Sequence, residues 1–132
     1  MLASDHGERA VKVTFSAYQP VDSYISNYLV TIAAERLTAT TPVTTGSDGD
    51  RLVEFVQGLA EEFRGWQGHR SWRSLEDQLR ITATWQSGGR VVLTLRATPS
   101  IYDRWSVTAD VTIEAGEDMR RFADDLATFL GA

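Results

Sequence analysis

The side chains best suited to chemistry gather in one short stretch, residues 64–72, which reads Arg-Gly-Trp-Gln-Gly-His-Arg-Ser-Trp. Within this stretch, Trp66, His69, Arg70 and Trp72 are the candidate binding residues. The guanidinium of Arg70 could present a planar donor fork to a carboxylate, and the two indole rings could supply apolar contact area. A ligand pocket at this stretch is therefore one hypothesis for function.

The same stretch also has a purely structural interpretation. Gly65 and Gly68 permit positive φ angles, and Trp66 and Trp72 would then plug the edge of the core. Arg70 would lie over one indole ring in a cation–π contact. We favour this interpretation because large aromatic side chains are mostly buried and a link in the middle of a chain must be anchored.

No catalytic signature accompanies these residues. The chain has no cysteine and two histidines, which argues against thiol nucleophiles, thiolate metal sites and a multi-histidine metal centre. The dinucleotide-binding, P-loop, zincin, nucleophile-elbow and EF-hand patterns are missing from the sequence. We therefore expect no catalytic residue, no metal ligand and no cofactor, and we do not expect an enzyme.

Acidic residues occur as four adjacent pairs, at positions 61–62, 76–77, 117–118 and 124–125. Neighbouring residues on a helix point about 100° apart, so such pairs do not converge on one substrate atom. We interpret them as solvated faces that make the exposed sides of two helices acidic. An acidic face of this kind would attract a basic partner.

Composition narrows the class of protein. The 132 residues are enough for one hydrophobic core, and the 42% apolar and 23% charged fractions are typical of soluble domains. A net charge of -5 argues against nucleic acid. No apolar run reaches the roughly 20 residues of a membrane helix, and no signal peptide opens the chain. We predict a cytoplasmic protein that binds neither nucleic acid nor membranes, and the bias towards Arg, Ala, Gly and Asp suggests a GC-rich bacterial genome.

Periodicity supplies the elements that would position these residues. Alternating apolar and polar residues predict strands over residues 10–18, 24–34, 37–43, 79–85, 91–97 and 105–114. Helical spacing predicts one helix after Gly49, with Ser47 or Asp48 as N-cap and Gly65 just past its end. A second helix is predicted after Gly116. The two apolar stripes are Leu52, Phe55, Val56, Leu59 and Phe63, and Met119, Phe122, Ala123, Leu126 and Leu130.

The order of elements, βββαβββα, predicts an α+β fold. The economical arrangement is a two-layer sandwich, in which a largely antiparallel sheet of about six strands carries both helices on its apolar face. The other sheet face would be polar and of mixed charge, a surface that can bind a partner. Its residues would be Lys12, Thr14, Arg80, Thr82, Thr84, Thr94, Arg96, Thr108, Asp110 and Thr112.

We predict one domain over residues 1–132, with an internal duplication of a βββα unit over 10–65 and 74–131. The two helices align at an offset of 67 residues, which pairs Gly49 with Gly116 and Phe55 with Phe122. The alternative is that two amphipathic helices with the same stripe align by chance.

The stretch from Gly65 to Trp72 also carries a family resemblance. Together with the preceding acid-flanked helix and the Ala115-Gly116-Glu117 entry into the last helix, it resembles a small actinobacterial family of unknown function. Its Gly-Trp-x-Gly-x-Arg-x-Trp core is the specific part, and the likeness covers most of the chain. More loosely, the layout is similar to that of WapI-type immunity proteins, which neutralise bacterial polymorphic toxins. That likeness implies a protein-binding role and carries over no functional residue.

Three functions follow as hypotheses. The first is a cytoplasmic protein-binding domain, an immunity-like partner of a toxin domain, which would use the acidic helix faces or the polar sheet face. The second is a small-molecule binder or undescribed enzyme with its pocket at residues 64–72. The third is a homodimer joined through the polar sheet face or an unpaired edge strand.

Overall fold

The fold is that of a computed structural model, which describes residues 2–3, 10–100 and 102–131. Three long strands and a helix occur twice along the chain, as the sequence predicts, and each half adds one short strand. The elements are β1 (Leu2–Ala3), β2 (Lys12–Pro20), β3 (Ile25–Ala34), β4 (Leu37–Gly46), the 3₁₀ turn η1 (Gly49–Arg51), α1 (Leu52–Glu61), β5 (His69–Arg73), β6 (Leu79–Gln86), β7 (Arg90–Ala97), β8 (Val107–Glu114) and α2 (Glu117–Leu130).

The strands form two antiparallel sheets, ordered β1-β2-β3-β4 and β5-β6-β7-β8. The prediction of an α+β fold with antiparallel strands is confirmed, and the prediction of a single sheet of about six strands is wrong. Alternation shows that each strand has one apolar face, but it does not show which strands pair. Two separate sheets can bury their apolar faces against each other as well as against helices.

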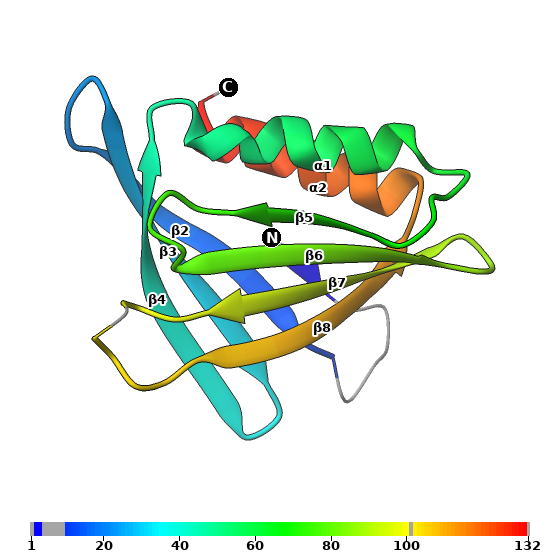
Figure 1. Ribbon diagram of the computed structural model, residues 1–132, viewed down its shortest axis with the longest axis horizontal. Coiled ribbons are helices and arrows are strands. Elements are labelled where there is room, and N and C mark those ends of the chain that lie inside the picture. Colours follow the sequence, from blue (N-terminus) through cyan, green and yellow to red (C-terminus); the bar gives the residue numbers. More distant parts are fainter. Residues whose placement is uncertain (1, 4–9, 101, 132) are drawn as a thin grey trace.

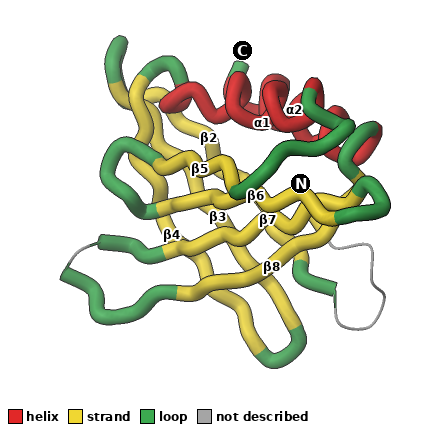
Figure 2. Tube along the Cα trace, turned by 45° about the vertical axis from the view of Figure 1, so that its right-hand side comes forward, coloured by secondary structure: helices red, strands yellow, loops and turns green. Residues whose placement is uncertain are grey.

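The two sheets lie face to face, with the helices along one end. In Figure 1 the β5–β8 sheet lies in front, and its strands cross the direction of β2, β3 and β4 behind it. Helices α1 and α2 run side by side next to β5 in both views (Figures 1 and 2). Helix α2 contacts β2 of one sheet and β8 of the other. The helices therefore cover the opening between two sheets and do not lie on one face of a single sheet.

The buried side chains of both sheets and both helices form one cluster. An aromatic group joins α2 to the first sheet, since the ring of Phe129 lies 5.8 Å from those of Tyr18 and Tyr28 and 6.2 Å from that of Phe15. Burial of a single large apolar side chain is worth about 1.5–3 kcal/mol, so this shared cluster is the main force that holds the layers together. The fully buried members include Tyr28, Ile32, Leu52, Leu79, Ile81, Leu93, Leu95, Met119, Phe122 and Leu126.

The ends of the elements differ in part from the prediction. Ser47 or Asp48 is predicted to cap the first helix, but Asp48 caps the preceding turn η1, where its carboxylate accepts from the backbone N–H of Asp50 at 2.9 Å, and the N-cap of α1 is Arg51. Helix α1 ends at Glu61, before Gly65, so Phe63 lies outside the helix and is 47% exposed. The last strand begins at Val107, two residues later than the alternation suggests.

Strand β5 was not predicted, because it lies inside the stretch read as a link. Its outward residues His69, Ser71 and Arg73 are exposed, and Trp72 is its one partly buried apolar residue. Five residues with one apolar side chain do not produce a recognisable alternation. Residues 4–9 lie outside the described residues, and before them Leu2 of β1 pairs with Val13 of β2.

The duplication of a βββα unit remains a prediction, since the repeat of element order alone does not distinguish shared ancestry from convergence. Among the described residues, no helix combines the length and apolar character needed to cross a membrane.

Substitutions at two glycines test whether the segment between α1 and β5 packs on the second sheet. Gly65 has a φ of +111°, and a Cβ there would lie 2.8 Å from the Trp85 ring, whereas a Cβ at Gly58 in α1 meets nothing within 4 Å. We expect Gly65→Ala to lower the free energy of unfolding by about 2–4 kcal/mol. Gly58→Ala, the matched control, should raise it by about 0.5–1 kcal/mol. Urea unfolding measures both, and similar values for the two variants would contradict this packing.

Candidate functional site

Trp66 and Arg70 lie together at the end of α1. The Arg70 guanidinium carbon is 5.8 Å from the centre of the Trp66 ring, and its Nη2 donates to Oε2 of Glu62 at 3.0 Å. Trp66 packs against the core, and its Nε1 is buried without a hydrogen-bond partner among the described residues. Both side chains are thus already engaged within the fold.

Trp72 and His69 lie apart from that pair. The Nε1 of Trp72 donates to the backbone carbonyl of Asp50 at 2.8 Å, and its ring packs against the core. His69 is exposed and pairs with Thr84. Successive strand residues point to opposite faces, so Arg70 and Trp72 share the face towards the helices, while His69 shares the outer face with Ser71. The four candidate residues therefore do not converge on one point.

Arg70 and Trp72 attach β5 to the two ends of α1. Arg70 contacts Glu62 just past the last helical residue, and Trp72 contacts Asp50 just before the first one. These contacts agree with the structural interpretation of residues 64–72. A ligand-binding role for the four residues stays a prediction.

Asp50 has a central structural role that sequence reasoning missed. Its Oδ1 accepts from the N–H of Gly46 at 3.0 Å, its Oδ2 accepts from the N–H of Leu75 at 2.8 Å, and its carbonyl accepts from Trp72. The backbone of Asp50 is left-handed, with a φ of 56°. Asp tolerates this conformation better than most residues, which is the one sequence signal that could have indicated the role.

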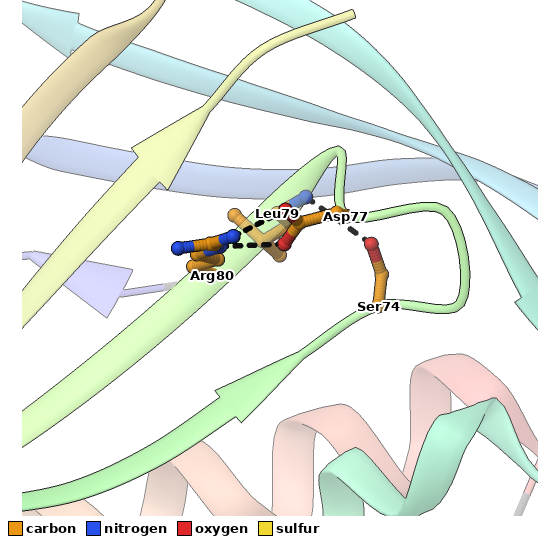
Figure 3. A network of polar contacts seen from close by, with 4 residues as sticks. All are labelled: Ser74, Asp77, Leu79 and Arg80. Carbon is orange, nitrogen blue, oxygen red and sulfur yellow. Dashed lines mark hydrogen bonds and ion pairs between the residues drawn. The ribbon is translucent and has the colours of Figure 1, made fainter. Parts of the chain in front are cut away.

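A second polar cluster occupies the turn between β5 and β6 (Figure 3). Asp77, also left-handed with a φ of 63°, accepts from Nε and Nη2 of Arg80 at 2.6 and 2.5 Å. The hydrogen bond from Arg80 lowers the pKa of Asp77 below its ordinary value, and the charges of Arg80, Arg73 and Arg96 lower it further. Ser74 steadies the same turn by accepting from the N–H of Leu79 at 3.2 Å.

An open groove of about 580 Å³ lies between the exposed sides of α1 and α2. Two buried alanines, Ala60 and Ala123, lie in it, and half-exposed Phe63 lines one part. Its other lining residues are Gln57, Glu61, Arg120 and Asp124. The groove thus combines apolar surface with a charged border.

The surface around this groove is acidic. Residues 50–64 and 117–130 hold eight acidic and four basic residues, which accounts for four of the five net negative charges of the chain. The ion pairs there are exposed, as between Arg121 and Glu117 at 3.6 Å, and such pairs leave most of the field in place. Over residues 2–3, 10–100 and 102–131, no three His, Asp or Glu residues are arranged to hold a metal ion.

DUF6228, described as a family of unknown function, matches residues 4–132. The chain belongs to this family. Neither a curated protein nor a solved structure matches it. The expected resemblance to a family of unknown function is confirmed, whereas the specificity of the Gly-Trp-x-Gly-x-Arg-x-Trp core and an actinobacterial origin stay predictions.

The contacts of β5 with α1 give a test of the structural interpretation. We expect Arg70→Ala to lower the free energy of unfolding by about 1 kcal/mol or less, because its ion pair is half exposed. Trp72→Phe should cost about 1–3 kcal/mol, because it removes a donor from the Asp50 carbonyl and some buried area. Urea unfolding of both variants measures the difference. A larger loss for Arg70→Ala than for Trp72→Phe would contradict this account of the link.

The Asp77–Arg80 pair predicts a pH dependence. Because the pKa of Asp77 is lowered by folding, its contribution to stability is present above the ordinary value of 3.8 and is lost as the pH falls through the folded value. We expect Asp77→Asn to be less stable than wild type at pH 7, with the difference disappearing between about pH 5 and pH 2. Asn tolerates the left-handed backbone, so the change isolates the charge. Glu35→Gln, at the exposed β3–β4 turn, is the control, and a pH-independent difference for Asp77→Asn would refute the assignment.

Proposed function

We propose that this DUF6228 protein is a non-enzymatic binding domain that recognises a basic protein partner through the groove between α1 and α2. The observation that carries the proposal is the combination, in one groove, of buried Ala60 and Ala123, exposed Phe63, and an acidic surround. Protein interfaces commonly have such an apolar centre and a polar rim, with aromatic residues enriched at the contact.

Charge complementarity supports a basic partner over a neutral or acidic one. Glu61 and Asp124 are both exposed and line the groove, and Arg120 is the one basic residue among the described residues that line it. An arginine or lysine of the partner could lay its apolar stem along Phe63 and the alanines while its charged head meets a carboxylate. The surrounding negative field would also accelerate encounter with a positively charged surface.

The specific partner we propose is a toxin domain with a basic surface, met in the cytoplasm. Support comes from the similarity of layout to immunity proteins, from the acidic balance of the chain, and from the absence of recognisable catalytic motifs in its sequence. In this role, the acidic groove would block a basic functional surface of the toxin.

Affinity capture with a charge-reversal variant tests the proposal. Tagged wild type should recover one dominant partner from its native lysate, and mass spectrometry should identify it as a protein with a basic surface. Glu61→Lys combined with Asp124→Lys should weaken binding of the purified partner at least about tenfold, because two favourable charge pairs become repulsive. The measured quantity is the Kd by calorimetry, and added salt should weaken wild-type binding.

A matched control separates local recognition from net charge. Glu35→Lys combined with Asp103→Lys makes the same change in net charge at exposed positions away from the groove. This control should bind the partner as wild type does, and all forms should keep the wild-type melting temperature. Equal binding by the groove variant, or recovery of no partner, would overturn the proposal.

A further inference from the structure

Three arginines form one row across the outer face of the second sheet. The register places Arg73 opposite Arg80, and Arg80 opposite Arg96, on β5, β6 and β7 in turn. The buried residues of β6 are Leu79, Ile81 and Ala83, so Arg80 and its row neighbours point away from the core. Like charges directly opposite each other destabilise a sheet, so the row has a cost unless an anion offsets it.

One carboxylate offsets this charge in part. Asp77 pairs with Arg80, and neither Arg73 nor Arg96 takes part in an ion pair among the described residues. Arg96 lines a neighbouring hollow together with Glu76, Asp77 and Asp103, so the excess of positive charge is at Arg73, with Arg80 paired to Asp77. The excess therefore contrasts with the acidic helices.

A hollow of about 440 Å³ lies along this row, lined by Ser71, Trp72, Arg73, Arg80 and Thr82. None of the described residues that line it is acidic. Ser71 and Thr82 are directly opposite each other and on the outer face, so their hydroxyls accompany the two guanidinium groups. The hollow thus offers hydrogen-bond donors from two charged and two neutral side chains.

The Asp77 carboxylate fixes the orientation of the Arg80 guanidinium. It holds Nε and Nη2, and Figure 3 shows the remaining guanidinium nitrogen directed away from Asp77. An arginine fixed in this way loses little side-chain entropy when it binds an anion. Asp77 is accordingly a positioning residue of the hollow.

We propose that this hollow binds a phosphate group, either free or as the monoester of a small molecule. The sign of the charge matches, because a phosphate monoester carries about -1.5 to -2 at pH 7 and the two charged side chains that line the hollow, Arg73 and Arg80, are both positive. Its three terminal oxygens can accept from both guanidinium groups and both hydroxyls, whereas a carboxylate has two oxygens to share among them. The proposal is independent of the helix groove, which lies on another part of the surface.

An NMR titration with sodium phosphate tests the site. At pH 7.5, with ionic strength held constant by NaCl, the amide signals of Ser71, Arg73, Arg80 and Thr82 should shift and saturate. Arg73→Gln should weaken the apparent affinity at least about tenfold, since it removes a charged donor. Arg36→Gln, which removes the same charge at the exposed β3–β4 turn, should titrate as wild type does.

Two further titrations identify the anion and its source. Sodium acetate at the same concentrations should shift these signals at least about tenfold less effectively, because it offers one charge and two oxygens. Tighter binding of phenyl phosphate than of phosphate would assign the site to monoesters, and equal binding would assign it to the free anion. The proposal is overturned if Arg73→Gln binds phosphate as wild type does, or if acetate or NaCl alone produces the same shifts. Arg73→Gln should keep the wild-type melting temperature or exceed it in phosphate-free buffer, which shows that lost binding is not lost folding.

Discussion

The hydrogen bonds of Asp50 are the constraint on which the arrangement of the two halves depends. One residue in a left-handed conformation joins the end of β4, the indole of Trp72 on β5 and the backbone of Leu75 in the next turn. Gln78 adds a parallel connection, because its Oε1 accepts from the N–H of Thr44 on β4 at 2.8 Å. Since β4 and β5 belong to different sheets, these bonds fix the position of the first strand of the second sheet relative to the first sheet. The same bonds place the start of α1 beside β5.

With α1 and α2 covering the opening between the sheets, the charges of the chain divide between two surfaces. The acidic residues of both helices face solvent together, and the arginine row stays on the outer face of the second sheet. Each surface has an electrostatic field of one sign, although the whole chain carries a net charge of only -5. The net charge of the sequence indicates only the acidic surface. The basic surface becomes apparent only when the register of three strands is known.

The sequence predicts the features that depend on local periodicity and does not predict those that depend on which strands pair. The apolar stripes of both helices and the alternation of the six long strands follow from periods of 3.6 and 2, and both were visible in the sequence. The division into two sheets depends on which strands pair, and no local period carries that information. Strand β5 escaped detection because Trp72 is its one partly buried apolar residue, and the role of Asp50 depends on partners as distant as Leu75. The arginine row likewise required the register of β5, β6 and β7.

Three indoles pack against the edge of the core, Trp66 and Trp72 from residues 64–72 and Trp85 from β6. Trp66 and Trp85 each bury an Nε1 that has no partner among the described residues, and Gly65 brings the backbone against the Trp85 ring. An unpaired buried donor costs about 1–3 kcal/mol, so these rings are retained for the apolar area that they bury at the edge of the core. Trp66 and Trp72 therefore hold the segment between α1 and β6 against the core, and a ligand-binding role for residues 64–72 stays a prediction.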